Sequence, residues 1–189
     1  MLTAKEVAGY IISEIKKQMT GLQPEEFDVT PLKLQKLLYY VQGYSLALTG
    51  KPAFADKIEA WKYGPVVDSV YQEYKRYNKS IIPYDEIKEE EIQDEALREV
   101  IRLVLSDKLC YSGGTLARAT HNEAPWSKNY VGALGGVYMN AEIPESEIRE
   151  YFAGEFEKRE EDYEDEDKAW KSIAEPVNLS ELEALLEGI

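Results

Sequence analysis

The side chains that most often carry acid–base, nucleophilic or metal chemistry are scarce in this chain. Its 189 residues include one histidine, His121, and one cysteine, Cys110. A metal site built on His121 would need carboxylates for its other ligands, and these lie mainly in surface-like runs. No serine occupies a strained strand–turn–helix elbow that could complete a Ser-His-Asp triad. We therefore predict that the protein is not an enzyme and holds no metal and no cofactor.

The remaining chemical motifs are also missing from the sequence. No phosphate-binding glycine pattern of either common type occurs, and Gly113-Gly114 alone predicts a turn. Cys110 lies in the apolar run from Leu103 to Tyr111, which predicts a small buried side chain in a reducing compartment. His121 follows a short helical segment and precedes Pro125-Trp126. We expect it to satisfy the end of that helix and pack on Trp126, or else to contact a partner.

Large aromatic side chains are the better candidates for a binding site. Tryptophan and tyrosine dominate protein interfaces because they offer rigid contact area with a polar tip. Trp61 and Tyr63 precede the Gly64-Pro65 corner, and Trp126 directly follows Pro125. We predict that Trp61, Tyr63 and Trp126 line an aromatic groove, while a core position remains the alternative for each ring.

These side chains must be positioned by helices. Capping signals and apolar residues at helical spacing predict a mainly α, compact multi-helix domain with at most a small β element near residues 58–63. The capping box Thr3-Ala4-Lys5-Glu6 opens the first helix, and Gly64-Pro65 is expected to start another. The expected helices cover residues 3–19, 30–50, 65–74, 89–107 and 116–120, one that begins near 144, and one that begins near 180.

The longest expected helix of the domain covers residues 30–50. Thr30-Pro31 supplies an N-cap and a proline at the first helical position, and Gly50 is a plausible left-handed terminator. Its buried stripe is expected to contain Leu34, Leu37, Leu38, Val41 and Leu48, joined by Tyr40 or Tyr44. Lys33 and Lys36 are expected on its solvent side.

Charge is distributed unevenly along the chain. The formal net charge is −14, and residues 154–189 contain 4 basic and 13 acidic residues. Within Glu155–Asp167, nine of thirteen residues are acidic, which predicts a solvated helix face or a loose linker. We therefore divide the chain into a domain at residues 1–153 and an acidic C-terminal extension at 154–189.

The extension also contains apolar residues that need a partner surface. Trp170 lies in a segment with little core of its own, and Leu182, Leu185 and Leu186 form the apolar face of a short terminal helix opened by a capping box at Ser180. Trp170 is expected either to dock on the domain or to insert into a partner. The acidic composition could equally serve solubility alone.

The composition also limits the classes of partner. An acidic chain without a basic stripe repels nucleic-acid phosphates, so direct nucleic-acid binding is not expected. No stretch is long and apolar enough to span a bilayer, and the charged first 20 residues do not resemble a signal peptide. We expect a cytoplasmic protein, and the sequence is compatible with a homo-oligomer.

Three motifs in a fixed order resemble one known family. They are Thr30-Pro-Leu-Lys-Leu-Gln-Lys-Leu-Leu-Tyr-Tyr, then Glu59-Ala-Trp-Lys-Tyr-Gly-Pro-Val-Val with Val70-Tyr71, and then Thr120-His121 with Pro125-Trp126. Residues 3–153 resemble the Panacea (SocA-like) antitoxin domain, including its phage-associated relatives. The segment before Thr120-His121 departs from the usual pattern.

This resemblance implies an antitoxin of a bacterial or prophage toxin–antitoxin pair, which neutralises its protein toxin by direct binding. One branch of the family resembles a proteolytic adaptor that delivers its toxin to a cellular protease, and a DNA-binding autoregulator is a further alternative. The expected partner-binding residues are Trp61, Tyr63, His121, Trp126, Trp170, Leu182, Leu185 and Leu186.

Overall fold

The computed structural model describes residues 1–18, 28–88, 90–134, 137–138 and 140–173. The chain divides into two compact units, Met1–Ala153 and Gly154–Ile189. Helix α7 (Glu145–Ile173) begins in the first unit and ends in the second. Each unit is described by itself below.

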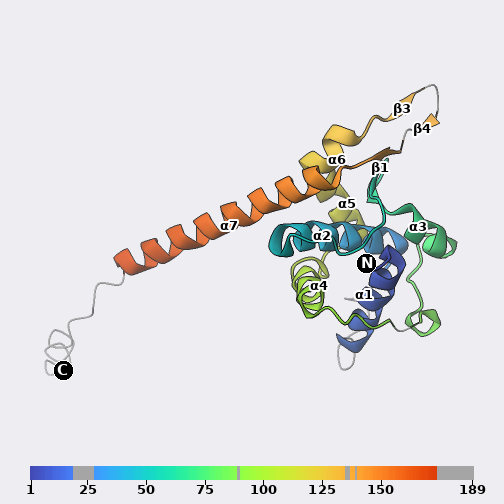
Figure 1. The fold of residues 1–189 in the computed structure, drawn as a ribbon, viewed down its shortest axis with the longest axis horizontal. Coiled ribbons are helices and arrows are strands. Elements are labelled where there is room, and N and C mark those ends of the chain that lie inside the picture. Colours follow the sequence, from blue (N-terminus) through green and yellow to red (C-terminus); the bar gives the residue numbers. More distant parts are fainter. Residues whose placement is uncertain (19–27, 89, 135–136, 139, 174–189) are drawn as a thin grey trace, which may run out of the picture. The chain divides into compact units, whose positions relative to one another are not determined.

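The first unit is built mainly of helices, as predicted (Figure 1). Short 3-10 turns follow α3 and precede α4, and they connect helices without adding to the core. The described α-helices before α7 are α1 (Ala4–Gln18), α2 (Pro31–Thr49), α3 (Asp68–Tyr74), α4 (Glu95–Lys108), α5 (Gly113–His121) and α6 (Ala124–Asn129), and the 3-10 turns are η2 (Lys75–Tyr77) and η3 (Tyr84–Glu86).

Helix α2 is the central element of this unit. It contacts α1, α3, α4 and α5, and it lies among these helices in Figure 1. The Thr30 side chain accepts a hydrogen bond from the Lys33 amide at 3.3 Å, and Gly50 ends the helix with φ +71°. Both capping predictions are therefore confirmed, because each residue has the conformation or bond that its capping role requires.

The solvent side predicted for α2 is wrong. Lys33 and Lys36 are both buried, whereas Leu48, expected in the apolar stripe, is 48% exposed in the last turn. Helices pack against several sides of α2, so nearly every side chain from Pro31 to Leu46 is covered. Lys33 donates to the Leu109 carbonyl at 2.7 Å, and burial lowers the pKa of its ammonium group.

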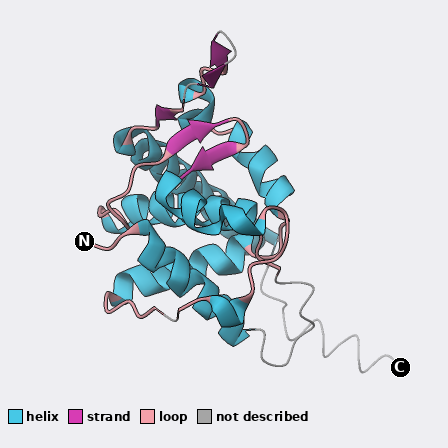
Figure 2. Cartoon of the chain, turned by 90° about the vertical axis from the view of Figure 1, so that its right-hand side faces the viewer, coloured by secondary structure: helices cyan, strands magenta, loops and turns pink. Residues whose placement is uncertain are grey.

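A small antiparallel sheet lies beside the helices (Figure 2). Its strand order is β2 (Gly64–Val66), β1 (Glu59–Trp61), β5 (Ala141–Glu142). The strand expected near residues 58–63 is therefore present. Gly64-Pro65, however, does not start a helix: it belongs to β2, and α3 begins only at Asp68.

The reason lies in the register of the hairpin. Trp61 pairs with Gly64, so Lys62 and Tyr63 form a two-residue turn, and Gly64 takes φ +96°. Pro65 lacks an amide donor, but β2 is an edge strand, where that donor is not required for the sheet.

Two helices start at positions that differ from the prediction. Helix α4 begins at Glu95 instead of residue 89, because the Asp94 side chain caps it by accepting from the Leu97 amide at 3.2 Å. Helix α5 begins at Gly113, capped by Ser112. A Cβ on Gly113 would lie 3.0 Å from the backbone nitrogen of Lys33, so glycine permits the close approach of α5 to α2.

Cys110 is exposed, which contradicts the prediction of a buried side chain. Helix α4 ends at Lys108, and Leu109 is the last buried residue of the apolar run. Cys110 falls in the turn that follows, where the helical periodicity no longer applies.

A second antiparallel strand pair follows Gly132 in the chain. Strand β3 (Ala133–Leu134) pairs with β4 (Val137–Tyr138). Gly132 has φ +73°, a left-handed conformation that glycine adopts at low cost.

An aromatic cluster fixes the start of α7 against α2. The Phe152 ring meets Tyr39, Tyr40 and Tyr44 edge-on at centroid distances of 5.4, 6.0 and 5.7 Å. A Cβ on Gly43 would lie 2.1 Å from the Phe152 ring. Phe152 therefore fills a space that only a glycine leaves on α2.

In the second unit, the described residues continue α7 to Ile173. Side chains 157–163 are exposed, so this part of the acidic run forms a solvated helix. The helix predicted from Ser180, with Leu182, Leu185 and Leu186, lies outside the described residues. Within the described part of the chain, no helix is both long and apolar enough to cross a membrane.

Candidate functional site

The hairpin turn and the first turn of α2 enclose an apolar groove of about 420 Å³. Its lining residues come from α2, the β1–β2 hairpin, α3 and two loop positions. They are Pro31, Leu32, Gln35, Trp61, Lys62, Tyr63, Val66, Tyr71, Asn78 and Asn140. Two of the three aromatic residues predicted for a groove, Trp61 and Tyr63, are therefore brought together here.

The aromatic side chains of the groove differ in exposure. Tyr63, in the hairpin turn, is 63% exposed, and Tyr71 on α3 is 37% exposed. Trp61 is half-buried, meets Tyr71 edge-on at 4.9 Å, and donates its indole hydrogen to Glu59 at 2.8 Å. These contacts fix the Trp61 side chain as one wall of the groove. The Tyr63 ring remains exposed and is available for contact with a partner.

Gln35, one of the residues that line the groove, fixes the backbone at Val67. Its side-chain oxygen accepts from the Val67 amide at 2.8 Å, and its side-chain nitrogen donates to the Val67 carbonyl at 3.2 Å. This reciprocal pair links α2 to the residue that precedes α3. Gln35 was not among the predicted site residues, although a polar residue in the middle of an apolar helical run is a signal for such a bond.

Trp126 does not line the groove. Its side chain is 8% exposed, and its indole nitrogen donates to the Trp61 carbonyl at 2.8 Å. The ring is stacked on His121 at 4.0 Å and on Tyr130 at 4.6 Å. Trp126 therefore joins α6 to the hairpin from behind, and it supports the strand that carries Trp61.

His121 is the last residue of α5 and packs on Trp126, as expected. Burial, and then the charge of Lys36, lower the pKa of its imidazole. Its Nε2 atom is buried and has no hydrogen-bond partner among the described residues. The α5 carbonyls near this end are satisfied instead by the Asn122 amide, which bonds Ala119 and Thr120.

A buried charged cluster lies behind the hairpin. Lys36 is 0% exposed and donates to the Pro65 carbonyl at 2.8 Å. Burial lowers the pKa of Lys36 to about 7, an effect that the charge of Glu123 partly offsets. Glu123, also buried, accepts a hydrogen bond from the Tyr40 hydroxyl at 2.8 Å. Burial and then Glu123 raise the pKa of Tyr40.

Gly64 allows the hairpin to sit on this cluster. A Cβ at Gly64 would lie 2.7 Å from the Lys36 ammonium nitrogen and 2.7 Å from the Thr120 hydroxyl oxygen. The Thr120 hydroxyl itself donates to the Ala117 carbonyl at 2.9 Å. Lys36 on α2 and Thr120 on α5 therefore pack directly against Gly64 of the hairpin. This packing fixes the position of the hairpin, which forms one side of the groove.

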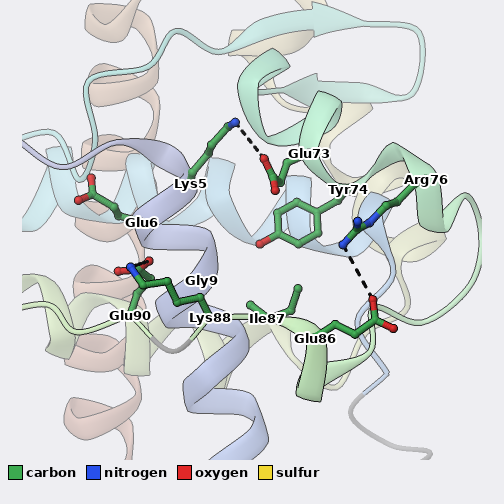
Figure 3. Close-up of a pocket in the computed structure, with 10 residues that line it drawn as sticks. All are labelled: Lys5, Glu6, Gly9, Glu73, Tyr74, Arg76, Glu86, Ile87, Lys88 and Glu90. Carbon is green, nitrogen blue, oxygen red and sulfur yellow. Dashed lines mark hydrogen bonds and ion pairs between the residues drawn. The ribbon is translucent and has the colours of Figure 1, made fainter.

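A second pocket of about 310 Å³ is lined by charged residues of α1, α3 and the segment before α4 (Figure 3). Its cations lie beside carboxylates: Lys5 pairs with Glu73 at 3.0 Å and Arg76 with Glu86 at 3.9 Å. The Tyr74 ring lies between these pairs and Ile87 (Figure 3). Such exposed ion pairs contribute little to stability. With three cations and four carboxylates, the lining has a formal charge of −1, which gives no strong field to recruit a charged ligand.

The other predicted site residues lie in the second unit. Trp170 is a residue of α7, and Leu182, Leu185 and Leu186 lie outside the described residues. No group of three or more histidine, cysteine, aspartate or glutamate side chains that could hold a metal occurs in the described ranges.

Comparison with known proteins identifies the family. Residues 34–127 match the model of the family described as antitoxin SocA-like, Panacea domain. This range runs from α2 into α6 and includes Lys36, the β1–β2 hairpin and the stacked rings of His121 and Trp126. The chain belongs to the SocA-like Panacea-domain family.

One curated relative supports this assignment. The chain is 30% identical over 112 residues to the antitoxin SocA of Caulobacter vibrioides (strain NA1000 / CB15N), an alignment that covers 53% of this chain and 60% of that protein. The chain thus matches less than two thirds of the relative's length. No solved structure is significantly similar to this chain.

Proposed function

We propose that this protein is an antitoxin that neutralises a cognate protein toxin by direct binding in the cytoplasm. The observation that carries the proposal is the family match at residues 34–127, together with the antitoxin named as a relative. The groove gives the proposal a physical site, because Tyr63 and Tyr71 present exposed aromatic area on a framework held by Gln35 and Lys36.

Neutralisation of this kind requires affinity and no chemistry. A nanomolar complex corresponds to about −12 kcal/mol, which a few rigid aromatic contacts in a protected groove can largely supply. The hairpin is held by backbone pairing, by the Trp126 indole and by the Lys36 ammonium, so little ordering is left to occur on binding.

The acidic extension forms a second part of the proposal. Residues 154–189 would act as a separate contact region, with Trp170 and the leucines at 182, 185 and 186 as apolar anchors. Its negative charge would accelerate association with a basic toxin at low salt. Because solubility alone also explains acidic composition, removal of this region tests whether it adds affinity.

The test is a growth assay in which this chain is co-expressed with the product of the neighbouring reading frame. We expect the neighbouring product to arrest growth and this chain to restore it. Tyr63→Ala should weaken rescue, whereas the matched variant Tyr111→Ala should not, because Tyr111 is 47% exposed and does not line the groove. Failure of the wild-type chain to restore growth would refute the antitoxin role.

Toxin abundance in the same cells separates direct inhibition from delivery to a protease. Direct inhibition predicts an unchanged toxin level during rescue. A toxin half-life that shortens only when this chain is present would favour the adaptor, and a mobility shift on the upstream DNA would favour an autoregulator.

A further inference from the structure

The charged pocket of Figure 3 contains a buried polar group that no other described residue uses. Tyr74 is 6% exposed, and its hydroxyl makes no hydrogen bond to any of the described residues. The side chain points from the end of α3 into the pocket (Figure 3). Buried polar groups are nearly always hydrogen-bonded, so this hydroxyl indicates a bond to something that enters the pocket. A volume of about 310 Å³ is far more than one water molecule needs, and it lies at the lower end of the range for small-molecule sites.

The Tyr74 hydroxyl is a hydrogen-bond donor at neutral pH. Burial, and then the charge of Glu73, raise the pKa of Tyr74 to about 12, so the hydroxyl keeps its proton. A carboxylate oxygen is the strongest acceptor that a small organic ligand commonly offers to such a donor.

A carboxylate and a guanidinium lie on either side of Tyr74 in the chain. Glu73 is in the last turn of α3, and Arg76 follows three residues later in η2, a spacing that places them near each other on one helical face. Both side chains are more than half exposed, at 51% and 65%. Arg76 donates to the Tyr77 hydroxyl at 2.6 Å, which uses one of the five N–H donors of its guanidinium.

The ion pairs that these two residues already make can be shared or exchanged at little cost. Glu73 pairs with Lys5 at 3.0 Å, whereas the closest approach of Arg76 to Glu86 is 3.9 Å. Exposed pairs of this kind contribute little to stability. A ligand that supplies both a cation and an anion would therefore replace what it displaces.

The charge balance of the lining determines the class of ligand. A lining with a formal charge of −1 gives a ligand of large net charge little attraction. A wholly apolar ligand would remove water from the charged side chains without replacing the lost bonds. A zwitterion meets both signs of charge, and Ile87 beside the Tyr74 ring offers an apolar surface for a side chain (Figure 3).

We propose that this pocket binds a free α-amino acid with an apolar side chain. Its carboxylate accepts hydrogen bonds from the Tyr74 hydroxyl and the Arg76 guanidinium, and its ammonium group donates to Glu73. Its side chain covers Ile87 and the Tyr74 ring. The site is lined by other residues than the aromatic groove, and the inference does not depend on the antitoxin role.

The test uses the full-length chain and three probes: L-leucine, L-leucinamide, which lacks the carboxylate, and N-acetyl-L-leucine, which lacks the ammonium. Binding is followed by NMR shifts of the backbone amides of Gly9, Tyr74 and Ile87. We expect leucine to bind at least about tenfold more tightly than either derivative, because each derivative loses one charged partner.

Three variants assign each contact. Tyr74→Phe should weaken leucine binding about tenfold and leave the urea unfolding midpoint unchanged, because the hydroxyl bonds no described residue. Arg76→Gln should abolish the preference for leucine over leucinamide, and Glu73→Gln should abolish its preference over N-acetyl-leucine. Tyr111→Phe and Arg118→Gln change exposed residues that do not line the pocket, and both should leave binding intact.

Several results would overturn the inference. They are no binding of leucine at concentrations up to about 10 mM, equal binding of leucine and both derivatives, shifts confined to residues outside the pocket, or unchanged leucine binding by Tyr74→Phe. Because the assay contains no toxin, leucine binding together with failed growth rescue would refute the antitoxin role alone. Growth rescue without leucine binding would refute this inference alone.

Discussion

Replacement of Lys36 by methionine should change how the stability of this protein depends on pH. Lys36 is fully buried, its ammonium bonds the Pro65 carbonyl, and its pKa falls from 10.5 to about 7 because burial disfavours the charge. In the unfolded chain the same group keeps an ordinary pKa near 10.5. Methionine has a similar length and no proton to release.

The magnitude follows from the two pKa values. Between pH 7 and 10.5 the unfolded chain holds a proton on Lys36 that the folded chain has released, so the free energy of unfolding rises with pH. The full difference between the two pKa values corresponds to about 5 kcal/mol, of which about 2 kcal/mol is recovered between pH 7 and pH 9. Below pH 7 both states are protonated, and this contribution becomes constant.

The assay is urea unfolding of the wild type and Lys36→Met at half-unit steps from pH 7 to pH 9. The wild type should gain about 2 kcal/mol relative to Lys36→Met over this range. The series stops there because Tyr40 and Tyr74, whose pKa values are raised by burial, reduce stability once unfolded tyrosine ionises above pH 10. Lys51→Met, an exposed substitution, should follow the wild-type curve.

Parallel curves for the wild type and Lys36→Met would refute the reasoning. They would mean that Lys36 is protonated equally in both states, and therefore that its ammonium reaches water in the folded protein.

Three further substitutions test the framework by urea unfolding at pH 7. Gly64→Ala should cost at least about 2 kcal/mol, because alanine is strained at φ +96° and its Cβ would lie 2.7 Å from the Lys36 ammonium; an unchanged midpoint would contradict the hairpin geometry. Trp126→Phe should cost about 1–3 kcal/mol by leaving the Trp61 carbonyl without its donor, and a neutral effect would show that water replaces the indole. Phe152→Ala should cost about 3–5 kcal/mol through the cavity it leaves, and a loss under 1 kcal/mol would mean that the aromatic cluster is not part of the core.

The sequence predicted the helix ends that are fixed by residues close to them in the chain. Thr30, Pro31 and Gly50 bound α2 because their effects depend on adjacent backbone groups. The capping box at Thr3 likewise forms, with the Glu6 side chain accepting from the Thr3 amide at 2.7 Å. These features need no knowledge of the rest of the fold.

The burial of individual side chains could not be predicted from local sequence for α2, because several helices pack around it. Lys33 and Lys36 were assigned to solvent because lysine is rarely buried, yet α2 has apolar residues on all its faces, which indicates a helix covered on every side. Long-range partners, the carbonyls of Leu109 and Pro65, make these burials possible. A single sequence does not reveal such partners.

The candidate groove was predicted in part for the same reason. Trp61 and Tyr63 were found because they are neighbours on one hairpin, whereas Tyr71 and Asn140 join them only through the tertiary fold. Trp126 was expected beside them and instead supports their strand from behind. Its indole bond spans 65 positions of sequence, a distance over which local patterns carry no information.

The most direct test of the antitoxin proposal is titration calorimetry of the purified full-length chain with the purified product of the neighbouring reading frame, in the absence of any protease. The account predicts a stoichiometric complex of nanomolar affinity that abolishes toxin activity, weakened at least about tenfold by Tyr63→Ala and unchanged by Tyr111→Ala. A toxin that stays fully active when saturated with this chain, or a complex equally tight with both variants, would contradict it.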